Sequence, residues 1–116
     1  MKYDKLTMSL LFDVYGALLT QKQRDCFDLH YNQDLTLAEI AENMGTTRQG
    51  VHDAVTRAEA QLQRLEEVTR CVQKDRRDWR LAADLERLAE ALAGAAPEEL
   101  DRLAAELRSA AEVLKE

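Results

Sequence analysis

Side chains that can contact bases and phosphates are concentrated in one short stretch, residues 47–57. Arginine can bond guanine through two hydrogen bonds and glutamine can do the same with adenine, so Arg48 and Gln49 are suited to reading base edges. We predict a nucleic-acid-binding set on this stretch, made of Thr47, Arg48, Gln49, His52, Asp53, Thr56 and Arg57. The candidates for additional phosphate contacts are Lys22, Arg24 and Arg64.

A helix-turn-helix unit over residues 36–57 would position these side chains. Thr36 is followed three residues later by Glu39, a capping box that predicts a helix start. Gly45 can take the left-handed conformation that closes a helix, and Thr47 can cap the next one. Apolar residues recur at helical spacing in both segments. A short helix, a tight turn and a second capped helix match the unit whose second helix enters a nucleic-acid groove.

The overall charge counts against a simple DNA-binding protein. The net charge is −6, whereas free-standing nucleic-acid-binding domains are usually basic because phosphate contacts supply most of their affinity. Glu42, Asp53 and Glu59 would also repel phosphates. Two interpretations therefore stay open: the second helix contacts nucleic acid, or the helix-turn-helix unit is only a packing module.

The whole chain is predicted to be all-α. Its 116 residues include 46% hydrophobic and 33% charged residues but only one proline and four glycines. A first helix is expected from Asp4 to Leu18, apolar on most of its circumference and therefore buried on more than one side. A chain this short has few other helices to bury both apolar sides of the first helix, so we expect a second subunit to bury one of them, in a homodimer. Thr20 and Gln23 form another capping box that opens a helix running to about Tyr31.

After the helix-turn-helix unit, heptad spacing continues to Val72. We expect a joint in the charged run 74–78 and a helix stop at 94–97, with leucine stripes in between and after. These stripes could form an internal helical pair, a subunit interface, or both. The chain is thus divided into a helix-turn-helix domain, residues 1–66, and a helical extension, residues 67–116, for oligomerisation or partner docking. Trp79 is either a partner anchor or the cap of the core.

No pattern points to catalysis, a cofactor or a metal ion. Glycine loops for phosphates and the common hydrolase and metalloprotease motifs are missing from the sequence. Cys26 and His30 share a helix face, but two ligands do not make a structural zinc site, so core packing is the favoured interpretation. Cys71 has no neighbour that would activate it. The sequence has no signal peptide and no apolar run long enough to span a membrane, so a cytoplasmic protein is expected.

Three segments together resemble the YlxM family of small bacterial proteins. They are L-F-D-V-Y-G-A-L-L-T-Q-K-Q-R (11–24), D-L-T-L-A-E-I-A-E (34–42) and T-R-Q-G-V-H-D (47–53), with Arg57 after them. The resemblance covers roughly residues 3–66, and the later residues match only as a charged helical tail. The family's helix-turn-helix region is similar to the fourth region of bacterial sigma factors, which implies the same fold here.

The resemblance also implies a function. YlxM proteins are cytoplasmic, often dimeric, and encoded beside genes of the signal recognition particle, so an accessory or regulatory role in protein targeting is expected. The implied partners are the particle's protein or its RNA. DNA is the alternative target, bound by a dimeric sequence-specific regulator. Gly50 stands where the family usually has alanine and His52 where it usually has tyrosine, so the base-reading part of the helix departs from the family pattern.

Overall fold

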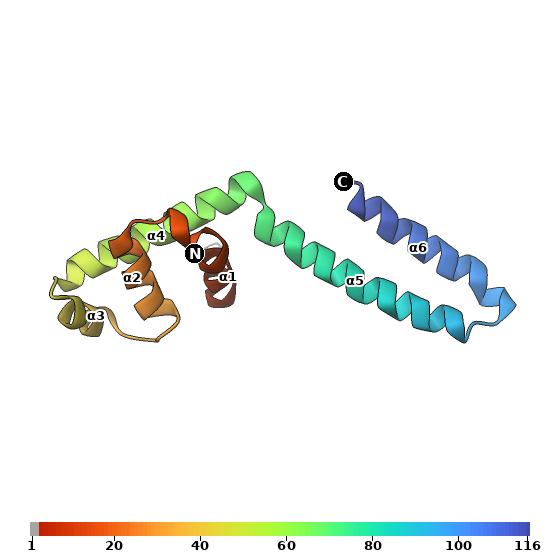
Figure 1. The fold of residues 1–116 in the computed structure, drawn as a ribbon, viewed down its shortest axis with the longest axis horizontal. Coiled ribbons are helices and arrows are strands. Elements are labelled where there is room, and N and C mark those ends of the chain that lie inside the picture. The colour runs from red at the N-terminus through yellow and green to blue at the C-terminus, as the bar shows by residue number, and fades with distance from the viewer. Residues whose placement is uncertain (1–2) are drawn as a thin grey trace. The chain divides into compact units, whose positions relative to one another are not determined.

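A computed structural model describes residues 3–116, which are all-α and contain no β-strand, as the sequence predicts. The chain separates into two compact units, of which the N-terminal unit ends at Val72 and the C-terminal unit runs from Gln73 to Glu116. The helices in chain order are α1 (Lys5–Tyr15), η1 (Gly16–Leu18), α2 (Gln21–Tyr31), α3 (Leu37–Met44), α4 (Arg48–Thr69), α5 (Cys71–Ala93), η2 (Pro97–Glu99) and α6 (Leu100–Leu114), where η marks a 3-10 helix (Figure 1).

The N-terminal unit is built on α4, against which α1, α2 and α3 all pack (Figure 1). Phe27 is fully buried at its centre and stacks on Phe12 and Tyr31, with ring centroids 4.8 and 4.2 Å apart. The other large side chains with no exposed surface in this core are Met8, Leu11, Ile40, Val51, Leu62 and Cys26. Burial raises the pKa of the Cys26 thiol, which therefore stays protonated and behaves as a small apolar side chain.

The predicted caps of the helix-turn-helix unit are confirmed. Thr36 and Glu39 form the reciprocal capping box at the start of α3. Gly45 closes α3 in the left-handed region, at φ 66°. The hydroxyl of Thr47 then accepts a hydrogen bond from the Gly50 amide, at 3.0 Å, and so opens α4. Local side-chain chemistry therefore fixes the turn between the two helices.

The first helix is shorter than predicted. It ends at Tyr15, and the expected residues up to Leu18 form the 3-10 turn η1 instead. Leu19 is extended because the next residue, Thr20, is the N-cap of α2. Leu6, Val14 and Leu18 lie on the solvent side of this segment and are 54–68% exposed.

The break in the long C-terminal helix lies at Arg70, not within residues 74–78 as predicted. Arg70 takes the left-handed conformation, φ 55°, and ends α4. Side chains of the last turn of α4 then cap the start of α5, since Thr69 Oγ1 accepts from the Cys71 amide at 3.2 Å and Glu66 Oε1 from the Val72 amide at 3.1 Å. Neither glycine nor proline marks this joint, so it has no local signal in the sequence.

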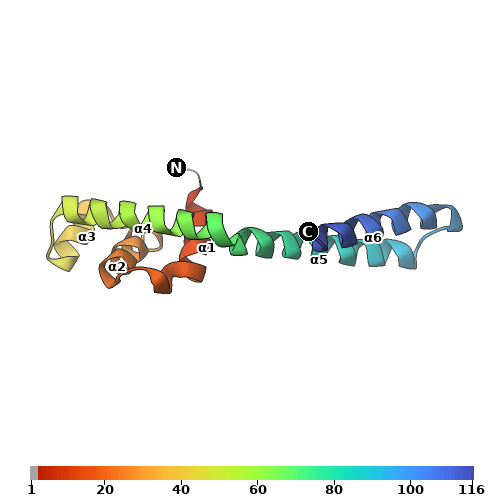
Figure 2. The same ribbon diagram turned by 90° about the horizontal axis from the view of Figure 1, so that it is seen from above.

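The C-terminal unit is a hairpin in which α5 and α6 run antiparallel and side by side (Figure 1 and Figure 2). Pro97 is the first residue of η2, the position that a proline tolerates at a helix start. Leu81, Leu88 and Leu103 are buried between the two helices. Within residues 3–116, no helix is both long enough and apolar enough to cross a bilayer.

Candidate nucleic-acid interface

The predicted base-contacting residues lie at the start of α4, and all of them are exposed. The exposed ones are Arg48, Gln49, His52, Asp53, Thr56 and Arg57. Thr47 is exposed as well, but its hydroxyl is engaged in the cap of α4. Val51, Ala54 and Val55 on the other side of the helix are buried in the core. The amphipathic pattern of α4 thus turns its polar face toward solvent.

A groove runs along this polar face, between the start of α2 and α4. It consists of two adjoining hollows of about 370 and 380 Å³ that share Thr20, Gln23 and Arg57. Lys22 lines the first hollow and Arg64 the second. Three of the predicted cationic residues therefore meet along one groove, although they come from positions up to 42 residues apart, 22 to 64.

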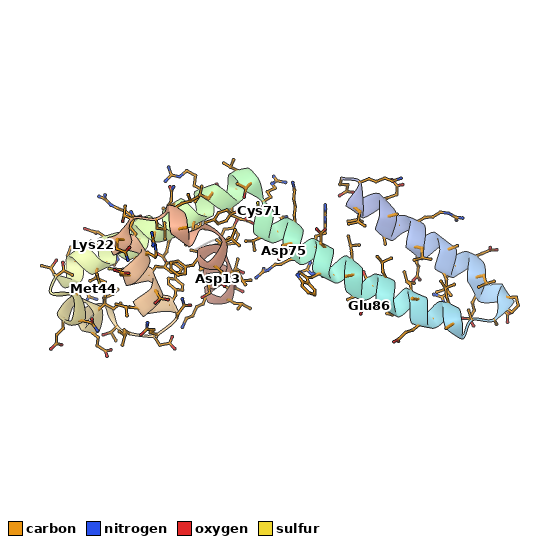
Figure 3. All side chains as sticks on the ribbon, in the orientation of Figure 1. Asp13, Lys22, Met44, Cys71, Asp75 and Glu86 are labelled. Atoms are coloured by element: carbon orange, nitrogen blue, oxygen red, sulfur yellow. The ribbon has the colours of Figure 1, made fainter. Side chains whose placement is uncertain are left out.

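Gly50 forms part of the floor of this groove. A methyl group at this position would lie 3.5 Å from Lys22 Nζ and 3.2 Å from Thr46 Oγ1. The methyl group would make an ordinary van der Waals contact with the Lys22 ammonium group, which therefore lies close to α4, and Figure 3 shows Lys22 beside the start of this helix. The sequence prediction missed Gly50, Thr20, Gln23 and Gln61 as groove residues, because only their packing in three dimensions reveals the shared surface.

Arg24 lies outside the groove. Its guanidinium donates a hydrogen bond to the carbonyl oxygen of Leu19, at 3.3 Å, and the side chain is half-buried against the protein. This contact helps to hold the extended segment before α2. Of the four cations predicted or implied to hold phosphates, Lys22, Arg57 and Arg64 are therefore the ones that the fold brings together.

Asp53 contacts two of the candidate residues and adds a negative charge to the site. Gln49 Nε2 donates to Asp53 Oδ1 at 2.9 Å, so one amide donor of the candidate adenine reader is occupied in the free protein. Asp53 also lines the groove and lies 3.8 Å from His52 Nδ1. A negative carboxylate beside Lys22 and Arg57 weakens the attraction of the groove for phosphate.

No metal centre is supported at His30 and Cys26. The Nδ1 atom of His30 lies 3.2 Å from the carbonyl oxygen of Leu35, and Cys26 contacts Met44, with the two sulfur atoms 3.6 Å apart. Both side chains thus have packing roles. In the part of the chain that the structure describes, no three histidine, cysteine, aspartate or glutamate side chains gather as metal ligands would.

Comparison with known proteins identifies the family. The family model UPF0122, described as "Putative helix-turn-helix protein, YlxM / p13 like", matches residues 2–97. The chain belongs to the UPF0122 family. The YlxM resemblance seen in the sequence is thereby confirmed, and the match extends beyond the helix-turn-helix unit into α5 and η2.

Several UPF0122 proteins are similar to this chain. One from Clostridium kluyveri is 56% identical over 54 residues, which cover 47% of this chain and 49% of the relative. One from Caldanaerobacter subterraneus is 50% identical over 74 residues, 64% of this chain and 63% of the relative. One from Bacillus cereus is 47% identical over 81 residues, 70% and 74%. The chain thus spans about half the length of the Clostridium relative and more of the other two.

Proposed function

We propose that this UPF0122 chain is a nucleic-acid-binding regulatory protein and an accessory factor of the signal recognition particle. The groove that joins Lys22, Arg57 and Arg64 beside the exposed start of α4 is the observation that carries the proposal. Phosphates lie in the groove, and the polar face of α4 meets bases or backbone next to it. The cytoplasm is the compartment where such a target is met.

The charge of the N-terminal unit indicates that nucleic acid is attracted by the groove alone and not by the unit as a whole. The sequence up to Val72 contains eight basic and eleven acidic residues, so the N-terminal unit as a whole repels a polyanion. Binding must then depend on the few cations in the groove, and it is lost at moderate salt. A folded RNA holds a few phosphates in one fixed arrangement, which a groove with few cations can bind. Such a target fits the groove better than a long duplex, which would require phosphate contacts along its whole length.

The test is a binding titration of the full chain against the purified particle, with and without its RNA, at several salt concentrations. Binding that requires the RNA and weakens with salt supports the proposal. If the groove holds two or three phosphates, the logarithm of the affinity falls against the logarithm of salt with a slope of about −2 to −3. No binding to either form of the particle at micromolar protein and low salt would contradict it.

Arginine variants locate the contact. Arg57→Ala and Arg64→Ala should each weaken RNA binding and reduce the salt slope by about 1. Arg102→Ala removes the same charge from an exposed arginine in α6 and serves as the matched control. If all three variants bind equally well, the groove is not the phosphate site.

DNA remains the second candidate target, because the exposed face of α4 carries the residues that a recognition helix uses in a major groove. A dimeric DNA regulator requires a roughly palindromic site. The Arg48→Ala/Gln49→Ala double variant separates the two candidates. Loss of sequence preference on duplex DNA favours direct reading of bases, whereas unchanged DNA binding excludes it.

A further inference from the structure

The groove between α2 and α4 is elongated and follows the axis of α4. Its two hollows share Arg57, so one continues into the other along the helix. The wall that α4 contributes contains a stripe of residues with alternating steps of four and three: Gly50, Ala54, Arg57, Gln61 and Arg64. With a rise of about 1.5 Å per residue, this stripe is about 21 Å long.

Both walls of the groove carry cations that a ligand can reach. Lys22 belongs to the α2 wall, and Arg57 and Arg64 belong to the α4 wall. All three residues are exposed, and within residues 3–116 none of them forms an ion pair. An anionic chain that lies in the groove is therefore contacted from two sides.

Negative charge is confined to one end of the groove. Among the residues that line the two hollows, only Asp53 is acidic, and it shares the first hollow with the two cations Lys22 and Arg57. The second hollow has Arg57 and Arg64 and no carboxylate. Asp25, the carboxylate nearest to Lys22 along α2, lines neither hollow. Phosphates are therefore attracted most strongly to the second hollow, away from the start of α4.

The base-reading face of α4 lies on a different side of the helix. Gln49, His52 and Thr56 are offset from the groove stripe by about a third of a turn, because each residue advances the helix by about 100°. A duplex that accepts this face in its major groove carries its phosphates on the outside of a cylinder, so it can touch only the rim of the groove. An unpaired strand is thin enough to lie inside and to be contacted from both walls.

The uncharged lining residues suit a sugar-phosphate backbone and not particular bases. Gln23 and Gln61 are half-buried in opposite walls, and their amides can donate to phosphate oxygens or to a 2′-hydroxyl. The side-chain oxygen of Gln23 already accepts from the Thr20 amide, at 3.1 Å, so its nitrogen is the group left for a ligand. None of the residues that line the two hollows is aromatic, so bases gain no stacking there.

We propose that the groove binds an unpaired strand of nucleic acid whose backbone runs along α4 from Gly50 to Arg64. This inference rests on the proposed function and names the form of its target, an unpaired segment of a folded RNA. A stacked strand carries about one phosphate per 3.4 Å, so a groove of about 21 Å covers at most about six nucleotides. Three phosphates meet the three cations, and the polar face at the start of α4 stays open for a second contact.

Titration of the full chain with fluorescent oligouridylates tests the proposal. Affinity should rise with length up to about six nucleotides, and beyond that only in proportion to the number of binding registers. An RNA duplex of the same length should bind at least about tenfold more weakly, because its phosphates reach only the rim. The logarithm of the affinity should fall against the logarithm of salt with a slope of about −2, since each of three phosphate contacts on a single strand contributes about −0.7.

Single substitutions assign the binding to the groove. Arg64→Ala should weaken oligouridylate binding and make the salt slope shallower by about 0.7. Asp53→Asn should tighten binding by up to about fivefold, because it removes the carboxylate charge and keeps an acceptor for Gln49. Arg102→Ala, in α6, is the matched control and should bind like wild type. Helical circular dichroism of each variant establishes that the fold is kept.

The proposal is overturned if the duplex binds as tightly as the oligouridylate, or if Arg64→Ala and Arg102→Ala bind the oligouridylate equally well. It is also overturned if no oligomer binds while the particle still binds through its RNA, an outcome that leaves the proposed function standing. Failure of the particle to bind contradicts the proposed function itself. Oligodeoxythymidylates of the same lengths show which part of the strand is read: a preference for RNA means that a 2′-hydroxyl is contacted, and equal binding means that phosphates alone are.

Discussion

At the scale of single residues, the most informative position is Glu66, a carboxylate only 4% exposed. It accepts hydrogen bonds from the hydroxyl of Tyr15, at 2.7 Å, and from the amide of Val72, at 3.1 Å. The Tyr15 hydroxyl also contacts Thr69. A buried charge is tolerated when it is hydrogen-bonded, and here those bonds join α1, the last turn of α4 and the first turn of α5. Glu66 thus works as a cap supplied from the preceding helix.

We predict that Tyr15→Phe lowers the free energy of unfolding by about 1–3 kcal/mol, because a buried carboxylate loses a hydrogen-bond donor. Chemical denaturation measures this directly. Glu66→Gln is the informative companion, since it keeps the acceptor and removes the charge. In the Glu66→Gln background the Tyr15→Phe change should cost less than in wild type. Equal costs in both backgrounds would mean that the two side chains are not coupled.

The dependence of stability on alkaline pH is a second test of the buried Tyr15 hydroxyl. Burial, with the Glu66 carboxylate adding to it, raises the pKa of Tyr15 from 10.0 to about 12. Between these values the native state keeps a proton that the unfolded state releases, so the free energy of unfolding falls as pH rises. Burial and Glu59 also raise the pKa of Tyr31, in the same direction. Denaturation midpoints should therefore drop between pH 10 and about 12, and less steeply in Tyr15→Phe. An unchanged slope in that variant would assign the effect elsewhere.

At the scale of elements, two glycines five residues apart set the helix-turn-helix geometry in different ways. Gly45 ends α3 at a positive φ of 66° with open space around its Cα. Gly45→Ala should cost about 1–2 kcal/mol in unfolding free energy from backbone conformation alone. Gly94→Ala is the matched control, since it also meets open space but has no positive φ. A comparable loss in both variants would show that φ is not the cause.

An alanine substitution at Gly50 should change the free energy of unfolding in the opposite direction. It lies in the first turn of α4, where alanine is favoured over glycine by up to about 1 kcal/mol. The added methyl group would meet the hydroxyls of Thr47 and Thr46 at 3.1 and 3.2 Å, so part of this gain is lost to small shifts of two side chains. We predict that Gly50→Ala raises the free energy of unfolding by less than about 1 kcal/mol. Destabilisation in thermal or chemical melts would show that the Thr47 cap cannot adjust.

At the scale of the whole molecule, local chemistry made the N-terminal unit predictable. Capping pairs and the turn glycine are short-range signals, and the structure confirms them at Thr20, Thr36 and Gly45. The predicted position of the joint was wrong because the contacts at Arg70 are tertiary: Glu66 accepts from the Val72 amide at the start of α5 and also from the hydroxyl of Tyr15, which belongs to another helix. The groove was half predictable. Its cations could be named from the sequence, but their meeting with Gln23 and Gly50 depends on how α2 packs on α4.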